Sequence, residues 1–540
     1  MAVTMVDQRA CTGSKRTGAT LPGRLRSAAT VILVLLVLYA GVAGIYRSSR
    51  KALWFDEVFT AVVAHLSSPA RIWDALARAA DSSPPPFLLI EGASQSLFGD
   101  EHVGLRFPAL AAFASIPVAL FLFIRKRLGD IPALIAAVVP LLTSLFSTYA
   151  IEARSYSMVA ACVAWAIVVW QDSERPGAAL ILAFLLGAAV CFHYYAVLVL
   201  VPLAISEAVR SVRLHKLRLG IWAAFFCGLI PLIAFARLLL SFRQIMGTNF
   251  WAPPSLSRIP AMYDSLLNLK AGWGAGLTLS LAVGLIVGLA ASLRDKPSES
   301  EPDLPIEERC LILLLLGLPC IGYVMVEVFN GGLTDRYAIA AALGSALAVA
   351  YLASRAGGQT AAWTLVMLLS VFGFQEIRQW AYHRSAPATA AFLAGEVQGL
   401  DDLVRNSAEP DLPVVISSGM EYLPLAYYTS HGRASRYIAL VDFQAAIAYA
   451  GSDTVDRGVA LLEPYLPLNI QEFSKFEPVH SRFLLYSGVW DDQWNWWPAR
   501  LRSAGYSLHP AGVNAGHVLY LVERGGVTSA KPLRNSASSN

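Results

Sequence analysis

The chain has few charged residues for its length. Of 540 residues, 15% are charged and 56% are hydrophobic, and the formal net charge is only +4. The mean hydropathy is +0.52. This composition is far from that of an average soluble domain and indicates a polytopic membrane protein. Basic residues occur in short clusters between apolar runs, which is typical of orientation signals and not of a nucleic-acid surface. We therefore expect no nucleic-acid partner.

Cysteines are also scarce, and two common binding motifs are missing. None of the six cysteines follows residue 320, and no two of them form a C-x-x-C pair. A disulfide framework or a thiolate metal site is therefore not expected. The C-terminal part of the chain has no G-x-G-x-x-G turn, so its sequence does not support nucleotide binding.

Long apolar runs dominate the first two thirds of the sequence. Eleven of them are long enough to cross roughly 30 Å of hydrocarbon. The run at 84–98 begins with Pro84-Pro85-Pro86 and contains Glu91, so we expect a short interfacial helix there. The eleven predicted spans lie at about 28–46, 105–124, 131–149, 155–170, 178–193, 194–209, 219–241, 276–293, 308–328, 337–353 and 361–377.

The distribution of basic residues predicts the orientation of these spans. Clusters such as Arg125-Lys126-Arg127 follow the even-numbered spans, as the positive-inside rule requires when the N-terminus is cytoplasmic. An odd number of spans places the C-terminal part outside. We interpret 28–46 as an uncleaved anchor and not as a signal peptide, because it reaches the length of a span. We expect a protein of the bacterial inner (plasma) membrane.

The chain is predicted to divide into four parts: a cytoplasmic tail at 1–27, a transmembrane domain at 28–380 with an external loop at 47–104, an external, periplasmic α/β domain at 381–525, and a disordered tail at 526–540. In the α/β domain the strands are expected at 412–417, 436–441, 482–486 and 517–522, and the helices at 421–428, 454–464 and 496–504.

Two adjacent acids follow the first span, in Trp54-Phe55-Asp56-Glu57. A carboxylate so close to hydrocarbon is costly unless it sits at the water boundary and has a use. Asp56 or Glu57 could act as a general base toward a hydroxyl or an amine. A solvated acidic pair at the membrane boundary explains the pattern equally well, and the sequence leaves both readings open.

Further polar residues are predicted on the same external face. Asp81 precedes the stiff Pro84-Pro85-Pro86 turn, where it is held in place or caps the next helix. Arg106, Arg154 and Arg336 lie at external ends of spans. Each arginine alone could simply extend its head group to water. Together they offer rigid forks that suit phosphate oxygens, so a phosphate-bearing substrate is plausible.

Aromatic and cationic residues line other external turns. His193-Tyr194-Tyr195 interrupts an apolar run, where the histidine could bind phosphate or the group could anchor the interface. The loop at 242–275 contains Trp251, Lys270 and Trp273, which could stack on sugar rings or lie on lipid headgroups. The acids form no clear metal-ligand set, and a divalent ion stays open.

Taken in order, these motifs resemble the GT-C glycosyltransferases. The match is to the branch that includes protein O-mannosyltransferases and the bacterial enzymes that transfer aminoarabinose or galacturonic acid to lipid A. It covers most of residues 28–380. The motifs that carry it are the acidic pair, the proline element, Leu105-Arg106-Phe107-Pro108, Arg127-Leu128-Gly129, Glu152-Ala153-Arg154-Ser155-Tyr156 and Arg336-Tyr337.

The resemblance implies an α-helical membrane fold of about 11 spans with an external α/β domain. It also implies a polyprenyl-phosphate sugar as donor, a lipid, glycan or protein as acceptor, and inversion at the anomeric carbon. By position, Asp56 would be the general base, and Glu57 or Asp81 would orient the base or the acceptor. Some relatives carry a lysine before the proline pair, where Ser82-Ser83 stands here. The residues expected to bind the donor phosphate or sugar are Arg106, Arg154, His193, Tyr194, Lys270, Arg336 and Tyr337.

Two other functions fit parts of the pattern. A transporter or flippase of a lipid-linked sugar would use the same charges to line a path. Such a protein needs access from both sides, whereas the unusual polar residues are predicted on one face, so the sequence favours the enzyme. A degenerate membrane anchor for a binding domain at 381–540 is the third reading, and the retention of Asp56 and Arg336 argues against it.

Overall fold

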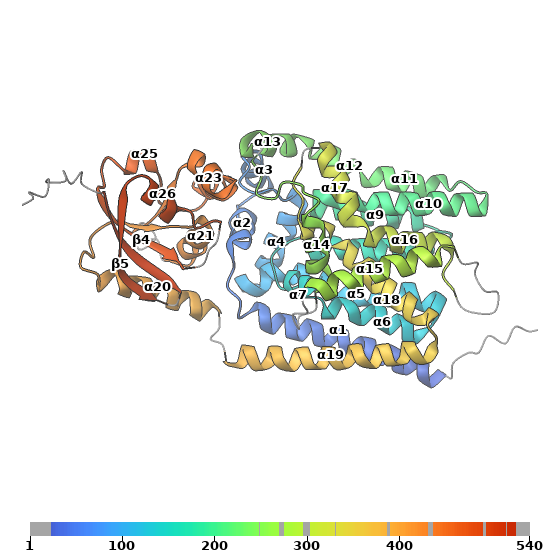
Figure 1. Cartoon of the computed structure of the whole chain (residues 1–540). Helices are drawn as coiled ribbons and strands as arrows, with labels where there is room; N and C mark the ends of the chain where they lie inside the picture. Colours follow the sequence, from blue (N-terminus) through green and yellow to red (C-terminus); the bar gives the residue numbers. More distant parts are fainter. Residues whose placement is uncertain are drawn as a thin grey trace, which may run out of the picture.

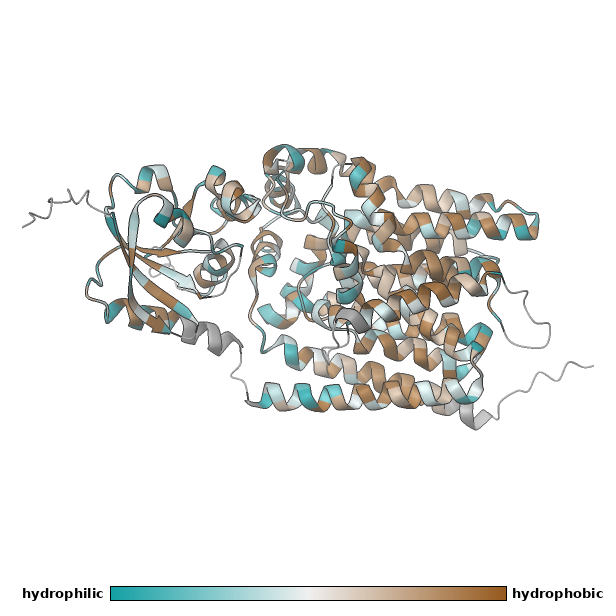
Figure 2. Ribbon diagram, viewed as in Figure 1, coloured by the Kyte–Doolittle hydropathy of each residue, from teal (hydrophilic) through white to brown (hydrophobic). Residues whose placement is uncertain are grey.

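The computed structural model contains a helical bundle and a mixed sheet at one end of it (Figure 1). We call the C-terminal part, residues 389–524, the sheet unit. Hydrophobic residues cover most of the bundle helices (Figure 2). The structure describes residues 23–247, 249–268, 275–294, 303–329, 331–385, 389–429, 436–489, 493–514 and 516–524. The predicted tail at 526–540 and most of the tail at 1–27 lie outside these ranges.

The bundle is built from helices that follow the predicted apolar runs. The helices before residue 200 are α1 (Gly23–Ser48), α2 (Phe55–Ala64), α3 (Pro69–Ala77), α4 (Pro85–Phe98), α5 (Glu101–Leu128), α6 (Asp130–Leu142), α7 (Ser144–Tyr149), α8 (Tyr156–Gln171), α9 (Ala178–Phe192) and η1 (Tyr194–Val199). Those that follow are α10 (Leu200–Leu214), α11 (Leu219–Gly228), α12 (Ile230–Ala234), α13 (Ala236–Met246), α14 (Arg258–Leu267), α15 (Ala275–Ser292), α16 (Ile306–Leu316), α17 (Leu318–Phe329), η2 (Asp335–Ala338), α18 (Ala340–Arg355) and α19 (Gly358–Ser385).

Not every predicted span is a single long helix. Within the described residues, four helices are long and apolar enough to cross a membrane, and two bent pairs pass the same test together. Five more apolar helices are shorter. Each predicted span falls on one of these helices or pairs, so the positions of the apolar elements are as expected, while the number of membrane crossings stays a prediction. The run at 84–98 forms α4, a separate short helix, as expected.

The sheet unit contains six strands in the order β3-β2-β1-β4-β6-β5. Strands β3, β2, β1 and β4 are parallel, and β4, β6 and β5 are antiparallel. The strands are β1 (Val414–Ile416), β2 (Tyr437–Val441), β3 (Ile470–Glu472), β4 (Arg482–Gly488), β5 (Tyr506–Asn514) and β6 (His517–Arg524). The helices are α20 (Thr389–Arg405), α21 (Gly419–Tyr428), α23 (Phe443–Ala450), α24 (Thr454–Leu462), α25 (Phe473–Phe476) and α26 (Trp497–Ser503).

All four predicted strands and all three predicted helices of this part are present, but β3 and β5 were not predicted. Strand β3 has three residues, none of them buried, so it carries no hydrophobic signal. Strand β5 contains Pro510 and shifts register between Pro510 and Gly512, which interrupts the alternation that identifies a strand. The expected domain boundary at residue 381 lies inside α19, which continues to Ser385.

The parallel part of the sheet has the crevice where many α/β domains bind ligands, between the carboxyl ends of β1 and β4. Here Asn495 binds the ends of both strands. Its side-chain oxygen accepts hydrogen bonds from Ser417 and, at 3.0 Å, from Ser487, and its amide donates to Gly488 O at 2.8 Å.

The sheet unit and the bundle share a hydrophobic core. One cluster of buried side chains includes Val58 and Leu76 of the bundle together with Tyr422 and Val459 of the sheet unit. Helix α2 also packs directly on α21. The sheet unit is thus held to α2, α3 and α4 by packing as well as by its covalent link to α19.

Candidate functional site

The candidate site lies at the end of the bundle that carries the sheet unit. Asp56 is in the first turn of α2, and Arg336 is in η2. Asp56 Oδ2 accepts a hydrogen bond from Arg336 Nη1 at 2.9 Å, and the two side chains are 19% and 13% exposed. The fold therefore brings together two charges that are 280 residues apart in sequence.

A second arginine braces the backbone of α2. Arg154 Nη1 donates to Asp56 O and to Thr60 Oγ1, both at 3.2 Å. The same nitrogen lies 3.9 Å from Asp81 Oδ2. The other oxygen of Asp81 accepts the Ser83 N–H at 2.7 Å, which fixes the carboxylate before the proline turn. The structure thus gathers Asp56, Asp81, Arg154 and Arg336 in one cluster.

Aromatic side chains surround Arg336, and we call Tyr156, Tyr195, Trp251 and Tyr337 the aromatic group. The Arg336 guanidinium lies 5.7 Å from the ring centroid of Tyr156 and 5.3 Å from that of Trp251. Tyr337 stacks on Tyr195 with centroids 4.3 Å apart. Rings at such distances contribute cation–π and stacking energy, and they restrict where the guanidinium can move.

His193 and Tyr194 lie beside this aromatic group. The His193 ring is 4.9 Å from Tyr337 and 5.3 Å from Tyr156, measured between centroids. Its Nδ1 accepts the Tyr195 N–H at 3.2 Å, so in the neutral ring the proton resides on Nε2. Tyr194 begins η1, is half-buried and is close enough to Asp81 for an electrostatic interaction.

Glu57 and Arg106 form a buried pair with a different environment. Both side chains are fully buried, and Arg106 Nε and Nη2 each donate to a Glu57 oxygen at 2.7 Å. The other Arg106 N–H groups donate to the carbonyls of Ser48, Lys51 and Ala52. All five donors of the guanidinium are therefore used within the protein. Here the structure departs from the expectation that Arg106 binds phosphate, because no N–H is left for it.

Glu57 is likewise committed to structure. Its Oε1 accepts the Ala153 N–H at 2.7 Å, and its Oε2 accepts the Trp54 N–H at 3.3 Å, which caps α2. Burial raises the pKa of Glu57, but Arg106 lowers it more, and the pKa ends below its usual value. Of the adjacent acids, Asp56 binds Arg336, and Glu57 holds the first turn of α2, to which both belong.

Two further acids lie behind the cluster. Glu152 pairs with Lys51 at 2.7 Å, and burial raises its pKa. Glu91 of α4 is fully buried, and neither of its oxygens has a hydrogen-bond partner among the described residues. Burial and the charge of Glu57 raise the pKa of Glu91 well above its usual value, which favours the protonated, neutral form of this side chain.

Three polar atoms of the cluster are buried without a hydrogen-bond partner among the described residues. They are Asp81 Oδ2, Arg154 Nε and Arg336 Nε. A buried donor or acceptor without a partner costs about 1–3 kcal/mol, so such atoms favour a ligand that satisfies them. The arrangement thus offers two cationic donors and one anionic acceptor to a substrate.

One predicted residue and the metal question need separate mention. Lys270 lies outside the described residues. Within the ranges that the structure describes, no group of three or more His, Cys, Asp or Glu side chains is placed to hold a metal ion.

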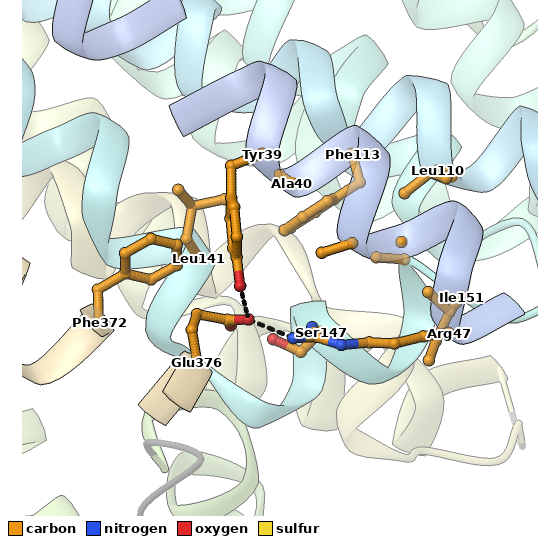
Figure 3. A pocket seen from close by; sticks show the side chains of 13 residues that line it. Tyr39, Ala40, Arg47, Leu110, Phe113, Leu141, Ser147, Ile151, Phe372 and Glu376 are labelled. Carbon is orange, nitrogen blue, oxygen red and sulfur yellow. Dashed lines mark hydrogen bonds and ion pairs between the residues drawn. The ribbon is translucent and has the colours of Figure 1, made fainter. Parts of the chain in front are cut away.

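A cavity lies near the site but is separate from it (Figure 3). It opens between α1, α5, α7 and α19, and Tyr39 and Arg47 both point toward Glu376. Tyr39 Oη donates to Glu376 at 2.8 Å, and Arg47 forms an ion pair with the same carboxylate. None of the predicted site residues lines this cavity. Through Glu376, this group of polar side chains connects α19 to α1. The contact with Arg47 lies at the end of α1, just before the segment that leads to Asp56.

Several contacts around the site had no signal in the sequence. Thr60 accepts a hydrogen bond from Arg154, but nothing in the sequence distinguishes it from the other threonines. Tyr428 binds the backbone of Leu53, and Ser452 binds that of Asn249. These pairs join the bundle to the sheet unit across 375 and 203 residues. Only an alignment of homologues or a structure could have revealed them.

The bundle of apolar helices, the sheet unit at one end and the charged site beside it define a membrane protein with the fold of the GT-C glycosyltransferases. Residues 82–240 match the family model described as dolichyl-phosphate-mannose-protein mannosyltransferase. This segment includes Arg106, Arg154 and His193. Comparison with curated protein sequences finds no match.

Two solved structures have the same fold along nearly the whole chain. ArnT from Cupriavidus metallidurans bound to undecaprenyl phosphate matches with a TM-score of 0.52 and 11% identity, over 92% of this chain and 98% of that one. ArnT in the apo state matches with a TM-score of 0.51, the same identity and the same coverage. These matches and the family model confirm the resemblance to the GT-C superfamily that the sequence motifs indicate.

Proposed function

We propose that this protein is a glycosyltransferase that moves a sugar from a polyprenyl-phosphate donor to a lipid, glycan or protein acceptor, with inversion at the anomeric carbon. The observation that carries the proposal is the Asp56–Arg336 pair at 2.9 Å, set beside Arg154 on a GT-C fold. The undecaprenyl phosphate bound by the structurally similar ArnT supports a polyprenyl carrier.

Asp56 serves as the general base in this reaction. Its carboxylate takes the proton from the acceptor hydroxyl or amine while that atom bonds to the anomeric carbon. The bond from the anomeric carbon to the phosphate oxygen breaks at the same time, and polyprenyl phosphate leaves with the bonding electron pair. Attack from the side opposite the phosphate inverts the anomeric centre.

Arg336 and Arg154 stabilise the leaving phosphate. Negative charge grows on the phosphate oxygen as the bond breaks, and fixed guanidinium groups favour that state over the ground state. The unpartnered Nε atoms of both arginines are available donors. We propose that the donor phosphate replaces Asp56 on Arg336, so that donor binding releases the base.

The remaining residues shape the substrate pocket. Asp81 Oδ2 has no hydrogen-bond partner and can accept one from a hydroxyl or amine of the sugar or the acceptor. Tyr337, His193 and Tyr194 offer ring faces and polar edges that suit a sugar. Glu57 and Arg106 act on the reaction only through the position of α2.

We propose that the site faces the periplasm, with the N-terminus in the cytoplasm of a bacterial inner membrane. The positive-inside distribution of basic residues supports this orientation. The sheet unit then lies outside, where an acceptor in the outer leaflet or the envelope can reach it.

Ion pairs at the opposite end of the bundle argue against a transporter. Arg213 pairs with Glu307 and Arg127 pairs with Glu308, each at 2.7 Å, and both glutamates are 2% exposed. Arg218 and Glu207 form a further buried pair. Breaking such a pair leaves a buried glutamate without its counter-charge, which disfavours an opening to that side. Movement of a lipid-linked sugar across vesicles without any glycosylated product would reverse this preference.

The proposal is tested in a strain that lacks the protein. Mass spectrometry of its envelope lipids and glycans is expected to show the loss of one sugar, which names the donor. Wild-type protein should restore the sugar and Asp56→Asn should not. Asp74→Asn is the matched control, since Asp74 is an exposed acid of α3 paired only with Arg78. Full restoration by Asp56→Asn at equal protein level contradicts the proposal.

A further inference from the structure

The sheet unit contacts the backbone just before Asp56. Tyr428, the last residue of α21, accepts the Leu53 N–H at 2.7 Å. Its hydroxyl also lies 2.9 Å from His102 Nε2. Since Tyr428 accepts from Leu53, its own proton is free to be donated to the histidine. Leu53 precedes Trp54, the residue that caps α2, and Asp56 is in the first turn of that helix.

A second contact from the sheet unit is made to the loop that lies beside Arg336, the partner of Asp56. Ser452 of the sheet unit is 2% exposed and donates to Asn249 O at 2.6 Å. Asn249 stands two positions before Trp251, whose ring lies 5.3 Å from the Arg336 guanidinium. In the same loop, Ala252 O accepts a hydrogen bond from the Leu333 N–H at 3.0 Å. Leu333 lies just before the start of η2.

Both contacted segments lack helix or strand structure of their own. Residues 51–54 and 249–254 lie between helices, so their positions depend on the groups that bind their backbones. From within the bundle, Arg106 holds the carbonyls of Lys51 and Ala52. From the sheet unit, Tyr428 binds the first segment, and Ser452 binds the second with the shorter of two hydrogen bonds, since Thr454 Oγ1 also donates to Asn249 O at 3.4 Å.

We infer that the sheet unit sets the geometry of the Asp56–Arg336 pair, with Tyr428 and Ser452 as positioning residues. The inference rests on the proposed function, in which Asp56 is the base and Arg336 holds the phosphate. Displacing a reacting group by about 1 Å can cost about 100-fold in rate. Loss of either hydroxyl lets one partner of the pair move, which lowers the rate of the chemical step more than the binding of the donor.

The test compares kcat and KM of full-length variants in membranes, with the polyprenyl-phosphate sugar that the deletion strain identifies. Tyr428→Phe and Ser452→Ala should each lower kcat about 10-fold, with the KM for the donor within about twofold of wild type. The double variant should lose far less than the product of the two single losses, because both act on one pair. Ser452→Thr, which keeps a hydroxyl, should recover most of kcat.

Two variants control for general damage to the sheet unit. Tyr422→Phe removes a hydroxyl on the same helix that bonds only to the Asn469 backbone of the sheet unit. Ser407→Ala removes a buried hydroxyl that donates to Val404 O. Both should keep the kcat of wild type. Melting temperatures separate a loss of rate from unfolding, which matters because Ser452 also accepts the Thr454 N–H at the start of α24.

The outcomes separate this inference from the proposed function. If Asp56→Asn is inactive but Tyr428→Phe and Ser452→Ala keep full kcat, or change only KM, the positioning inference is overturned and the proposed function stands. If Asp56→Asn is as active as wild type, the proposed function fails first. A kcat loss in Tyr422→Phe and Ser407→Ala as large as in the two test variants also overturns the inference, because the effect would then be general.

Discussion

At the scale of single residues, the two adjacent acids have opposite environments. Asp56 is partly exposed and faces Arg336, whereas Glu57 is fully buried and bound to Arg106. The residue pattern alone identified both as candidates without separating them, and only the resemblance to the GT-C glycosyltransferases predicted Asp56 as the base and an orienting part for Glu57. Which of two neighbours on a helix turn faces a cleft depends on the packing of α2 against the rest of the fold, and a sequence pattern does not contain that information.

The Glu57–Arg106 pair leads to a prediction about stability. Glu57→Gln leaves a buried guanidinium without its counter-charge, which typically costs about 3–5 kcal/mol of unfolding free energy. Thermal unfolding in detergent should show the loss. Asp74→Asn, which affects an exposed pair, should change stability by less than about 1 kcal/mol. A Glu57→Gln protein that is as stable as wild type but inactive would instead assign Glu57 a direct part in the chemistry.

Glu91 gives a pH prediction. Its pKa is raised by burial, so its ionisation disfavours the folded state, and the stability present at low pH is lost as the pH rises through the raised pKa. Glu91→Gln mimics the protonated acid, the form that burial favours, and should keep activity within about twofold at pH 7. Its stability should fall less at alkaline pH than that of wild type, measured by thermal unfolding. A large loss of activity at pH 7 would show that the charged form is needed.

At the scale of elements, the apolar runs were predictable because hydrocarbon imposes a length and a composition on each helix. The short helix α4 and the four predicted strands follow from such local patterns, whereas α2 and α3 were not predicted within the external loop at 47–104. Strand β5 was missed because Pro510 and the register shift break the alternation. The bends between α11–α12 and α13, of 49°, and between α16 and α17, of 62°, were missed because each run stays apolar across its break.

Helix α24 offers a second pH prediction, within the sheet unit. Asp456 is 7% exposed, and burial raises its pKa from 3.8 to about 7. Because the folded pKa is above the unfolded one, the neutral form favours folding, and stability falls as the pH rises through about 7. Asp456→Asn should therefore raise stability at alkaline pH by about 2–4 kcal/mol and flatten the pH profile of thermal unfolding. An unchanged profile would mean that Asp456 reaches water or a cation in the folded protein.

At the scale of the whole molecule, the site brings together distant parts of the bundle. Asp56 and Asp81 come from the region before α5, Arg154 precedes α8, and Arg336 follows α17. The sequence predicted that these residues share one face, from the threading of the spans. It could not predict the distances between them, or the two contacts from the sheet unit, because those depend on tertiary packing across hundreds of residues.

The same scale distinguishes an enzyme from an anchor or a transporter. The hydrophobic core shared by α2 and the sheet unit argues against a C-terminal part that works as a separate binding domain. At the opposite end of the bundle, ion pairs between arginines and buried glutamates link the helices. A charged site at one end of the bundle fits a transferase with a membrane-bound donor better than a transporter.

The most direct measurement is sugar transfer in membranes from a labelled polyprenyl-phosphate donor, comparing wild type, Asp56→Asn and Asp74→Asn at equal protein levels. We predict that wild type and Asp74→Asn transfer the sugar at similar rates, while Asp56→Asn loses at least about 100-fold, as expected on removal of a general base. Transfer by Asp56→Asn at the rate of wild type would contradict the assignment of Asp56 as the base, and with it the central claim.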